Sequence, residues 1–159
     1  MQSIALFACN IAGERWEMAA ITHNEGLDLF YGSRNRADLV SWFAKVAHRC
    51  VELLSVEDLL DGAQAHNRRD AGVQFVPIKQ IVASLDRQGD FTRSFLPRAG
   101  ISADRWVRLY EALRGPEGFP EVELLRVGDR YAVLDGHHRI SVARAAGMDE
   151  IAAHVVEVA

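Results

Sequence analysis

Apolar and polar positions follow different patterns in the first and the last parts of the chain. In residues 37–47 apolar side chains recur every three or four positions, a spacing that predicts an amphipathic helix. Ser55, which two acidic residues follow closely, predicts the N-cap of a second, short helix. Residues 1–35 are harder to read, because their first apolar stretch suits a strand or a helical turn equally well. The pattern predicts a largely helical appendage over residues 1–65.

A polar stretch, residues 62–72, predicts a linker between this appendage and the rest of the chain. The apolar residues 74–84 then predict a strand, or a strand followed by a turn of helix. Residues 86–100 predict an irregular loop. Ser102 predicts the N-cap of a helix that ends at Gly115.

The clearest local prediction is a β-hairpin, followed by a helix and a last strand. Two apolar runs in residues 121–135 are joined by Gly128 and Asp129, which are typical of a two-residue hairpin turn. Residues 138–147 predict a helix whose final glycine suits the C′ position, and residues 150–158 predict a strand. A hairpin mixed with crossover helices indicates the α+β class with a mixed sheet.

Composition fits a globular protein in a reducing compartment. The chain has 159 residues, of which 49% are hydrophobic, so one domain with a small appendage can bury a sizeable core. No run approaches the roughly 18 apolar residues of a membrane helix, and the start lacks the basic region of a signal peptide. Cys9 and Cys50 have no metal-ligand spacing, so we expect free, buried thiols and a cytoplasmic location. Trp42 and Trp106 are expected in the core.

Charge is distributed unevenly along the chain. The formal net charge is -4, yet residues 66–108 carry 8 basic and 4 acidic side chains, a local charge of +4. A basic segment in an acidic protein favours a compact anionic ligand over a broad nucleic-acid surface. The alternative is an ordinary solvated face with ion pairs.

The most informative stretch is YAVLDGHHRISVARAAG, residues 131–147, in which an apolar strand turns into a helix. Gly136 permits a sharp turn and a close approach of a ligand to the backbone. The amides of the next residues begin a helix and lack intrahelical acceptors, so they form an anion site. Arg139 adds a guanidinium suited to phosphate oxygens, and His137 and His138 can donate to phosphate or become cationic beside it.

Two groups of acidic and polar residues complete this candidate site. Asp135 precedes the turn, where it could hold a Mg²⁺ that accompanies phosphate or accept a proton. The purely structural alternative is that Asp135 caps the helix and pairs with the arginine. After the first strand, Ser84 and Arg87 are candidate phosphate contacts, and Asp86 and Asp90 are candidate bases or metal partners. An ordinary polar loop is the alternative here.

Residues 127–158, VGDRYAVLDGHHRISVARAAGMDEIAAHVVEV, resemble the ParB/sulfiredoxin superfamily in the hairpin, the Gly-x-x-Arg turn and the alanine-rich helix. The stretch VPIKQIVAS, residues 76–84, is similar to the first conserved box of that superfamily. The resemblance covers residues 73–159 and implies a ParB/sulfiredoxin-like mixed sheet with flanking helices. The N-terminal helical appendage, predicted from the residue pattern, precedes this domain.

The resemblance implies a nucleotide-phosphate site at the turn. The superfamily includes CTP-binding ParB clamps, ATP-using sulfiredoxins, and free serine kinases that use ADP or ATP. Sulfiredoxins have their reactive cysteine where this chain has His137, so that chemistry is excluded. The turn is most similar to the Asp-Gly-His-Thr-Arg of free serine kinases, from which only His138 departs. Those kinases use a glutamate base after the first strand, where this chain offers only Asp86 and Asp90.

The sequence therefore predicts a protein that binds a nucleoside di- or triphosphate (CTP, ATP or ADP, the base being open) with Mg²⁺. Asp135 and His137 are the candidate catalytic residues if nucleotide hydrolysis or phosphate transfer follows. Two alternatives stay open: a small-molecule kinase acting on an amino acid, and a DNA-binding partition or transcription-associated protein. The acidic net charge and the end of the chain at Ala159, with no helix-turn-helix after the turn, disfavour DNA. A homodimer is a further open partner, and no membrane is expected.

Overall fold

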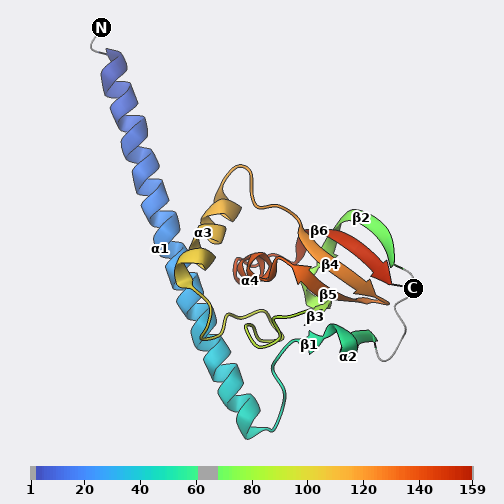
Figure 1. Cartoon of the computed structure of the whole chain (residues 1–159). Helices are drawn as coiled ribbons and strands as arrows, with labels where there is room; N and C mark the ends of the chain where they lie inside the picture. The colour runs from blue at the N-terminus through green and yellow to red at the C-terminus, as the bar shows by residue number, and fades with distance from the viewer. Residues whose placement is uncertain (1–2, 61–67, 159) are drawn as a thin grey trace.

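The computed structural model describes residues 3–60 and 68–158, which form the elements labelled in Figure 1. Their order is α1 (Ser3–Val46), β1 (Leu54–Ser55), α2 (Val56–Leu60), β2 (Arg68–Pro77), the 3₁₀ turn η1 (Ile78–Gln80), β3 (Ile81–Ser84), α3 (Ala103–Arg114), β4 (Val122–Val127), β5 (Arg130–Asp135), α4 (His137–Ala145) and β6 (Glu150–Val158).

The strands form one six-stranded mixed sheet in the order β1-β3-β5-β4-β6-β2. The β4–β5 and β2–β6 pairs are antiparallel, and the β1–β3, β3–β5 and β4–β6 pairs are parallel. Parallel neighbours need a crossover connection. For the parallel pair β4–β6, the chain makes this connection through β5 and α4. The predicted α+β fold with a mixed sheet and flanking helices is confirmed.

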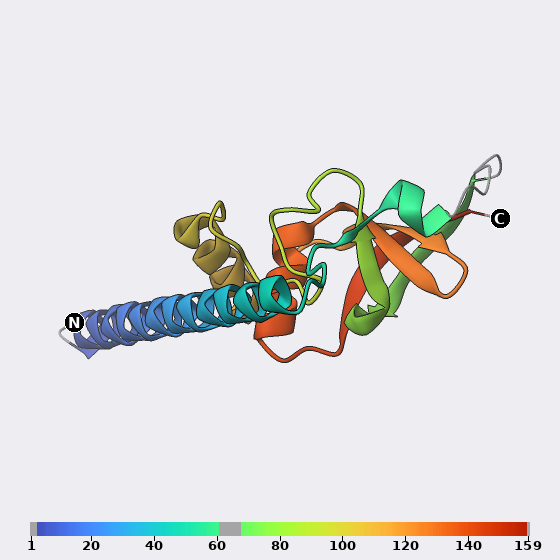
Figure 2. The ribbon, with the colours of Figure 1, turned by 90° about the horizontal axis from the view of Figure 1, so that it is seen from below.

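The helices lie mostly on one side of the sheet. Figures 1 and 2 show α4 next to the sheet, α3 beside it, and the long α1 running along the outside of both. The main core lies between this sheet face and the helices and includes Trp106, Ile140 and Val133. A smaller cluster around Val56 and Leu125 covers part of the opposite face, where α2 packs. Trp106 is fully buried, as predicted.

Most of the predicted elements are confirmed. The hairpin turns at Gly128, whose φ is 61°, and α4 ends before Gly147, whose φ is 81°. Ser102 caps α3 by accepting a hydrogen bond from the Arg105 amide. Residues 74–84 follow the strand-plus-turn alternative, since β2, η1 and β3 succeed one another there.

The N-terminal segment departs from the prediction in extent and in contacts. Residues 3–46 form one continuous helix, including the part that the pattern left open between strand and helix. Phe30, Ala37 and Ala44, seven residues apart, form its buried stripe against the domain. Trp42 is 59% exposed, so its assignment to the core is wrong. The reason is that α1 carries apolar residues on several sides, and only the side with Phe30, Ala37 and Ala44 faces the domain.

Two further predictions need correction. Residues 68–72 begin β2 and pair with β6, so they are not linker, while residues 61–67 lie outside the described residues. The Cys50 thiol is free but exposed, because it follows the end of α1, and the Cys9 side chain lies outside the described part. No helix in the part of the chain that the structure describes is long and apolar enough to cross a membrane.

Candidate functional site

Gly136 forms the turn between β5 and α4, at the position that the sequence predicted. Its φ of 102° lies in the left-handed region that side chains disfavour. A Cβ added there would lie 2.5 Å from Cγ1 and 2.8 Å from Cβ of Val122, on the neighbouring strand β4. The glycine therefore allows α4 to start directly against β4, which brings the first turn of α4 to the edge of the sheet.

Arg139 and Asp135 hold the two sides of this turn together. The Arg139 Nη1 donates to the carbonyl oxygens of Pro120 at 3.0 Å and Glu121 at 2.7 Å, and its Nη2 pairs with the Asp135 carboxylate. The Arg139 side chain is 16% exposed, whereas Asp135 is largely exposed. Both Nη groups of Arg139 are engaged within the protein, so the ion pair of the structural alternative is present. Asp135 does not cap α4, whose N-cap is Gly136 without a side-chain cap hydrogen bond.

His137 and Ser84, predicted as separate phosphate contacts, are joined in the interior. The Ser84 hydroxyl and the His137 Nε2 are hydrogen-bonded at 2.6 Å, and the Ser84 oxygen also accepts from the Arg87 amide at 3.0 Å. Ser84 is fully buried, and the ring of Phe91 stacks on that of His137. This contact fixes the loop after β3 against the start of α4.

Both histidines of the turn are neutral at physiological pH. Burial lowers the pKa of His137 to about 4, with a further contribution from the Arg87 guanidinium. Burial likewise lowers the pKa of His138 to about 4, together with the positive charges of Arg105 and Arg87. Neutral imidazoles can donate to a ligand oxygen, but the positive charge of the site must come from arginines.

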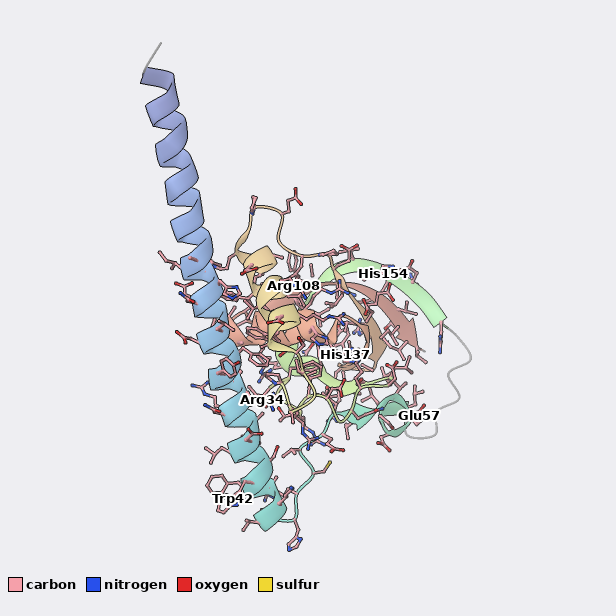
Figure 3. The ribbon with its side chains drawn as sticks, turned by 60° about the vertical axis from the view of Figure 1, so that its left-hand side comes forward. Arg34, Trp42, Glu57, Arg108, His137 and His154 are labelled. Atoms are coloured by element: carbon pink, nitrogen blue, oxygen red, sulfur yellow. The ribbon has the colours of Figure 1, made fainter. Side chains whose placement is uncertain are left out.

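Those arginines line a cavity at the start of α4. Its volume is about 350 Å³, and its walls include Gly136, His137, His138 and Asp135 from the turn. Four arginines line it as well: Arg87 after β3, Arg105 and Arg108 on α3, and Arg139 on α4. Figure 3 labels Arg108 and His137 on their separate elements.

Arg105 and Arg108 were missed by the sequence reasoning. They are three residues apart and so share one face of α3. Among the described residues their side chains have no hydrogen-bond or ion-pair partner. Their signal in the sequence was the basic segment 66–108, whose excess charge they help to supply at its end.

The acidic candidates after β3 lie outside this cavity lining. Asp90 pairs with the Arg87 guanidinium at 3.2 Å between partly exposed side chains, an arrangement that contributes little to stability. Asp86 is exposed as well, though near enough to influence the charge of His137. Asp135 is thus the one carboxylate among the lining residues.

A resident metal does not fit this donor set. The described residues contain no group of three or more His, Cys, Asp or Glu side chains that could hold an ion. Mg²⁺ on a nucleotide typically takes one or two carboxylates plus phosphate oxygens. Asp135, with its exposed carboxylate, fits that lesser role, so a magnesium ion would come with its ligand.

Comparisons with known proteins bear on the fold only. No family model and no curated protein matches the chain. It is similar to sulfiredoxin from Arabidopsis thaliana, with 13% identity and a TM-score of 0.41 over 52% of this chain and 82% of that one. It is also similar to the C-terminally truncated chromosome-partitioning protein ParB from Caulobacter crescentus complexed with CTP-gamma-S, with 17% identity and a TM-score of 0.42. That match covers 56% of this chain and 46% of that one, so the chain spans about half the length of this ParB. Both similarities are ones of fold alone.

Proposed function

We propose that the cavity at the start of α4 binds the phosphate groups of a nucleoside di- or triphosphate. The observation that carries this proposal is the meeting of four arginines from three elements at one helix start. Arg105 and Arg108 are exposed and have no anionic partner among the described residues, so their guanidinium groups are available to phosphate oxygens. The amides of His137 and His138 supply further donors at the positive end of the helix.

The roles of the lining residues differ. Arg105 and Arg108 are the free cations and contact phosphate oxygens directly. Arg87 adds a third positive charge. Its guanidinium leaves the Asp90 carboxylate and binds the ligand instead. Arg139 acts mainly by holding the turn in place, because its Nη groups already bond to Pro120, Glu121 and Asp135.

A calorimetric titration of the full chain with CTP, ATP, ADP and GTP, each with and without Mg²⁺, tests the proposal. Each lost charged hydrogen bond weakens binding by about tenfold or more, so Arg105→Gln and Arg108→Gln should both raise Kd to that extent. Arg114→Gln, on the same helix but outside the cavity, is the matched control and should bind as the wild type does. Absence of binding by every nucleotide, or equal affinity in all three variants, would exclude a phosphate site here.

The role of Asp135 toward magnesium has a separate test. If this carboxylate contacts the ion that accompanies the nucleotide, Asp135→Asn should reduce the gain in affinity that Mg²⁺ confers. A gain unchanged in Asp135→Asn would remove this residue from the metal's surroundings. Product analysis in the same samples reports whether hydrolysis or phosphate transfer to a small hydroxyl compound follows binding.

A further inference from the structure

A second cavity, of about 390 Å³, lies where α1 meets the domain. Its walls come from three parts of the chain: the middle of α1, residues 94–96 of the loop after β3, and the last turns of α4. Figures 1 and 2 both show α1 passing alongside α4. The volume lies within the range of small-molecule sites, roughly 300 to 1,000 Å³. This cavity shares no lining residue with the one at the start of α4.

Two arginines in the lining of this second cavity have no internal partner among the described residues. Arg36 on α1 and Arg144 on α4 both line it, and neither guanidinium has an ion-pair partner among the described residues. The Ser33 side chain, one helical turn before Arg36, is 8% exposed. No hydrogen bond to its hydroxyl exists within the described part of the chain. These three groups are available to donate to one anionic ligand: Arg36 is exposed, Arg144 is half-buried, and no buried side-chain polar atom among the described residues lacks a partner.

The remaining walls narrow the class of ligand. Phe95 and Leu96 give the cavity an apolar side, which suits an organic body rather than a bare inorganic ion. Asp28 adds one negative charge, so the lining carries two positive charges and one negative. That balance favours a single negative charge on the ligand over the double charge of a phosphate monoester.

We propose that this second cavity binds a small carboxylic acid with an apolar body. Arg36 and Arg144 donate to the two carboxylate oxygens, since the planar guanidinium matches carboxylate geometry. The Ser33 hydroxyl donates a further hydrogen bond, and Phe95 and Leu96 contact the apolar part. A ligand held in this way joins α1 to α4, and so fixes the N-terminal helix to the domain.

Benzoate is a suitable probe, because it combines one carboxylate with one apolar ring. Titrated into the isotope-labelled full chain in the millimolar range expected of so small a ligand, it should shift the amide resonances of residues 28–36, 94–96 and 141–145. Arg144→Gln and Ser33→Ala should each weaken binding, the arginine change by about tenfold or more. Arg114→Gln serves as the control for loss of one exposed arginine and should bind benzoate like the wild type.

Phenyl phosphate and benzylamine identify the charge that the cavity selects. Benzoate binding tighter than phenyl phosphate, with no binding of benzylamine, supports a carboxylate site. Tighter binding of phenyl phosphate would overturn the carboxylate assignment. Benzoate shifts that are absent, that fall on residues 135–139, or that persist at full affinity in a folded Arg144→Gln chain would overturn the site itself. Since Arg105→Gln leaves this cavity intact, it should retain benzoate binding, so failure here and failure of the nucleotide proposal are separable.

Discussion

At the scale of single residues, the turn before α4 is held by contacts that its side chains make within the protein. Gly136 faces Val122 of β4, His137 bonds to Ser84, and Arg139 bonds to backbone carbonyls. The sequence placed Ser84 and the turn in one candidate site, and the structure brings Ser84 to His137. The sequence could not indicate that His137 bonds to Ser84 or that Arg139 bonds to the Glu121 carbonyl, because these partners lie 53 and 18 positions away in the chain.

Gly136→Ala should lower the free energy of unfolding by about 2 to 4 kcal/mol. The Cβ would meet the Val122 side chain at 2.5 Å, and the positive φ adds strain of its own. Gly128→Ala is the matched control, since its φ of 61° is also positive but nothing lies near its Cβ. Chemical denaturation should show a cost of only about 1 kcal/mol there. Equal losses in the two variants would contradict the close packing of Gly136 on β4.

The free energy of unfolding should decrease as pH is lowered, because the two buried histidines resist protonation in the folded state. Their pKa values are lowered to about 4, while the imidazoles of the unfolded chain take up protons below about pH 6.5. The contribution is therefore complete above pH 6.5 and is lost as pH falls toward 4. Each histidine should contribute a slope of at most about 1.4 kcal/mol per pH unit within this window.

Denaturant midpoints measured across that window test this dependence. In His137→Gln, whose side chain does not titrate, the slope against pH should be about half that of the wild type. A slope that is the same in both proteins would place the titrating groups elsewhere.

At the scale of elements, the packing of α1 separates two aromatic residues on one helix. Phe30 is 1% exposed and touches Trp106 of α3, with ring centroids 5.6 Å apart, whereas Trp42 points to solvent. Figure 3 shows Trp42 near the C-terminal end of α1, directed away from the domain. Phe30→Ala should therefore lower the free energy of unfolding by about 3 to 5 kcal/mol, and Trp42→Ala by no more than about 0.5 kcal/mol.

Equilibrium denaturation of the two variants distinguishes this arrangement from a loosely attached helix. If Phe30→Ala costs as little as Trp42→Ala, then α1 does not share the core of the domain. A large loss in Trp42→Ala would indicate that its exposed side chain is covered in solution, for example by a second copy of the chain.

Local elements were predictable because their signals are local. The hairpin at Gly128, the Ser102 cap and the helix after Gly136 each follow from neighbouring residues, and all three are present. The face that α1 buries was not predictable, because its apolar residues lie on several sides. Contacts with α3 and α4, far along the chain, determine that Phe30 is buried and Trp42 is not. The place of Arg105 and Arg108 in the cavity was not predictable for the same reason, because the other lining residues come from distant segments of the chain.

At the scale of the whole molecule, the predicted boundary between residues 1–65 and residues 73–159 can be tested by unfolding. Phe30 and Leu53 from the first segment belong to the same core as Val133 and Ile140 from the second. Strand β1 also extends the sheet beside β3. A shared core of this kind should unfold in one cooperative transition.

Coincident denaturation curves from circular dichroism and from Trp106 fluorescence would bear out that expectation. Replacing Trp16 and Trp42 by phenylalanine leaves Trp106 as the only tryptophan of the chain, so that its emission reports the core alone. Two separate transitions would instead mean that the N-terminal segment folds as an independent unit.

Because β6 lies between β4 and β2, the order of synthesis matters for this sheet. The ribosome synthesises β2 early and β6 late. Among the described residues, β6 is the only strand with which β2 pairs. Until β6 emerges, the nascent chain carries a ten-residue strand without a partner, on which Val73 and Phe75 are exposed even in the finished fold. Unpaired strands with apolar side chains are prone to aggregate. Chains that stall before Glu150, rather than the completed protein, are thus the species most in need of a chaperone.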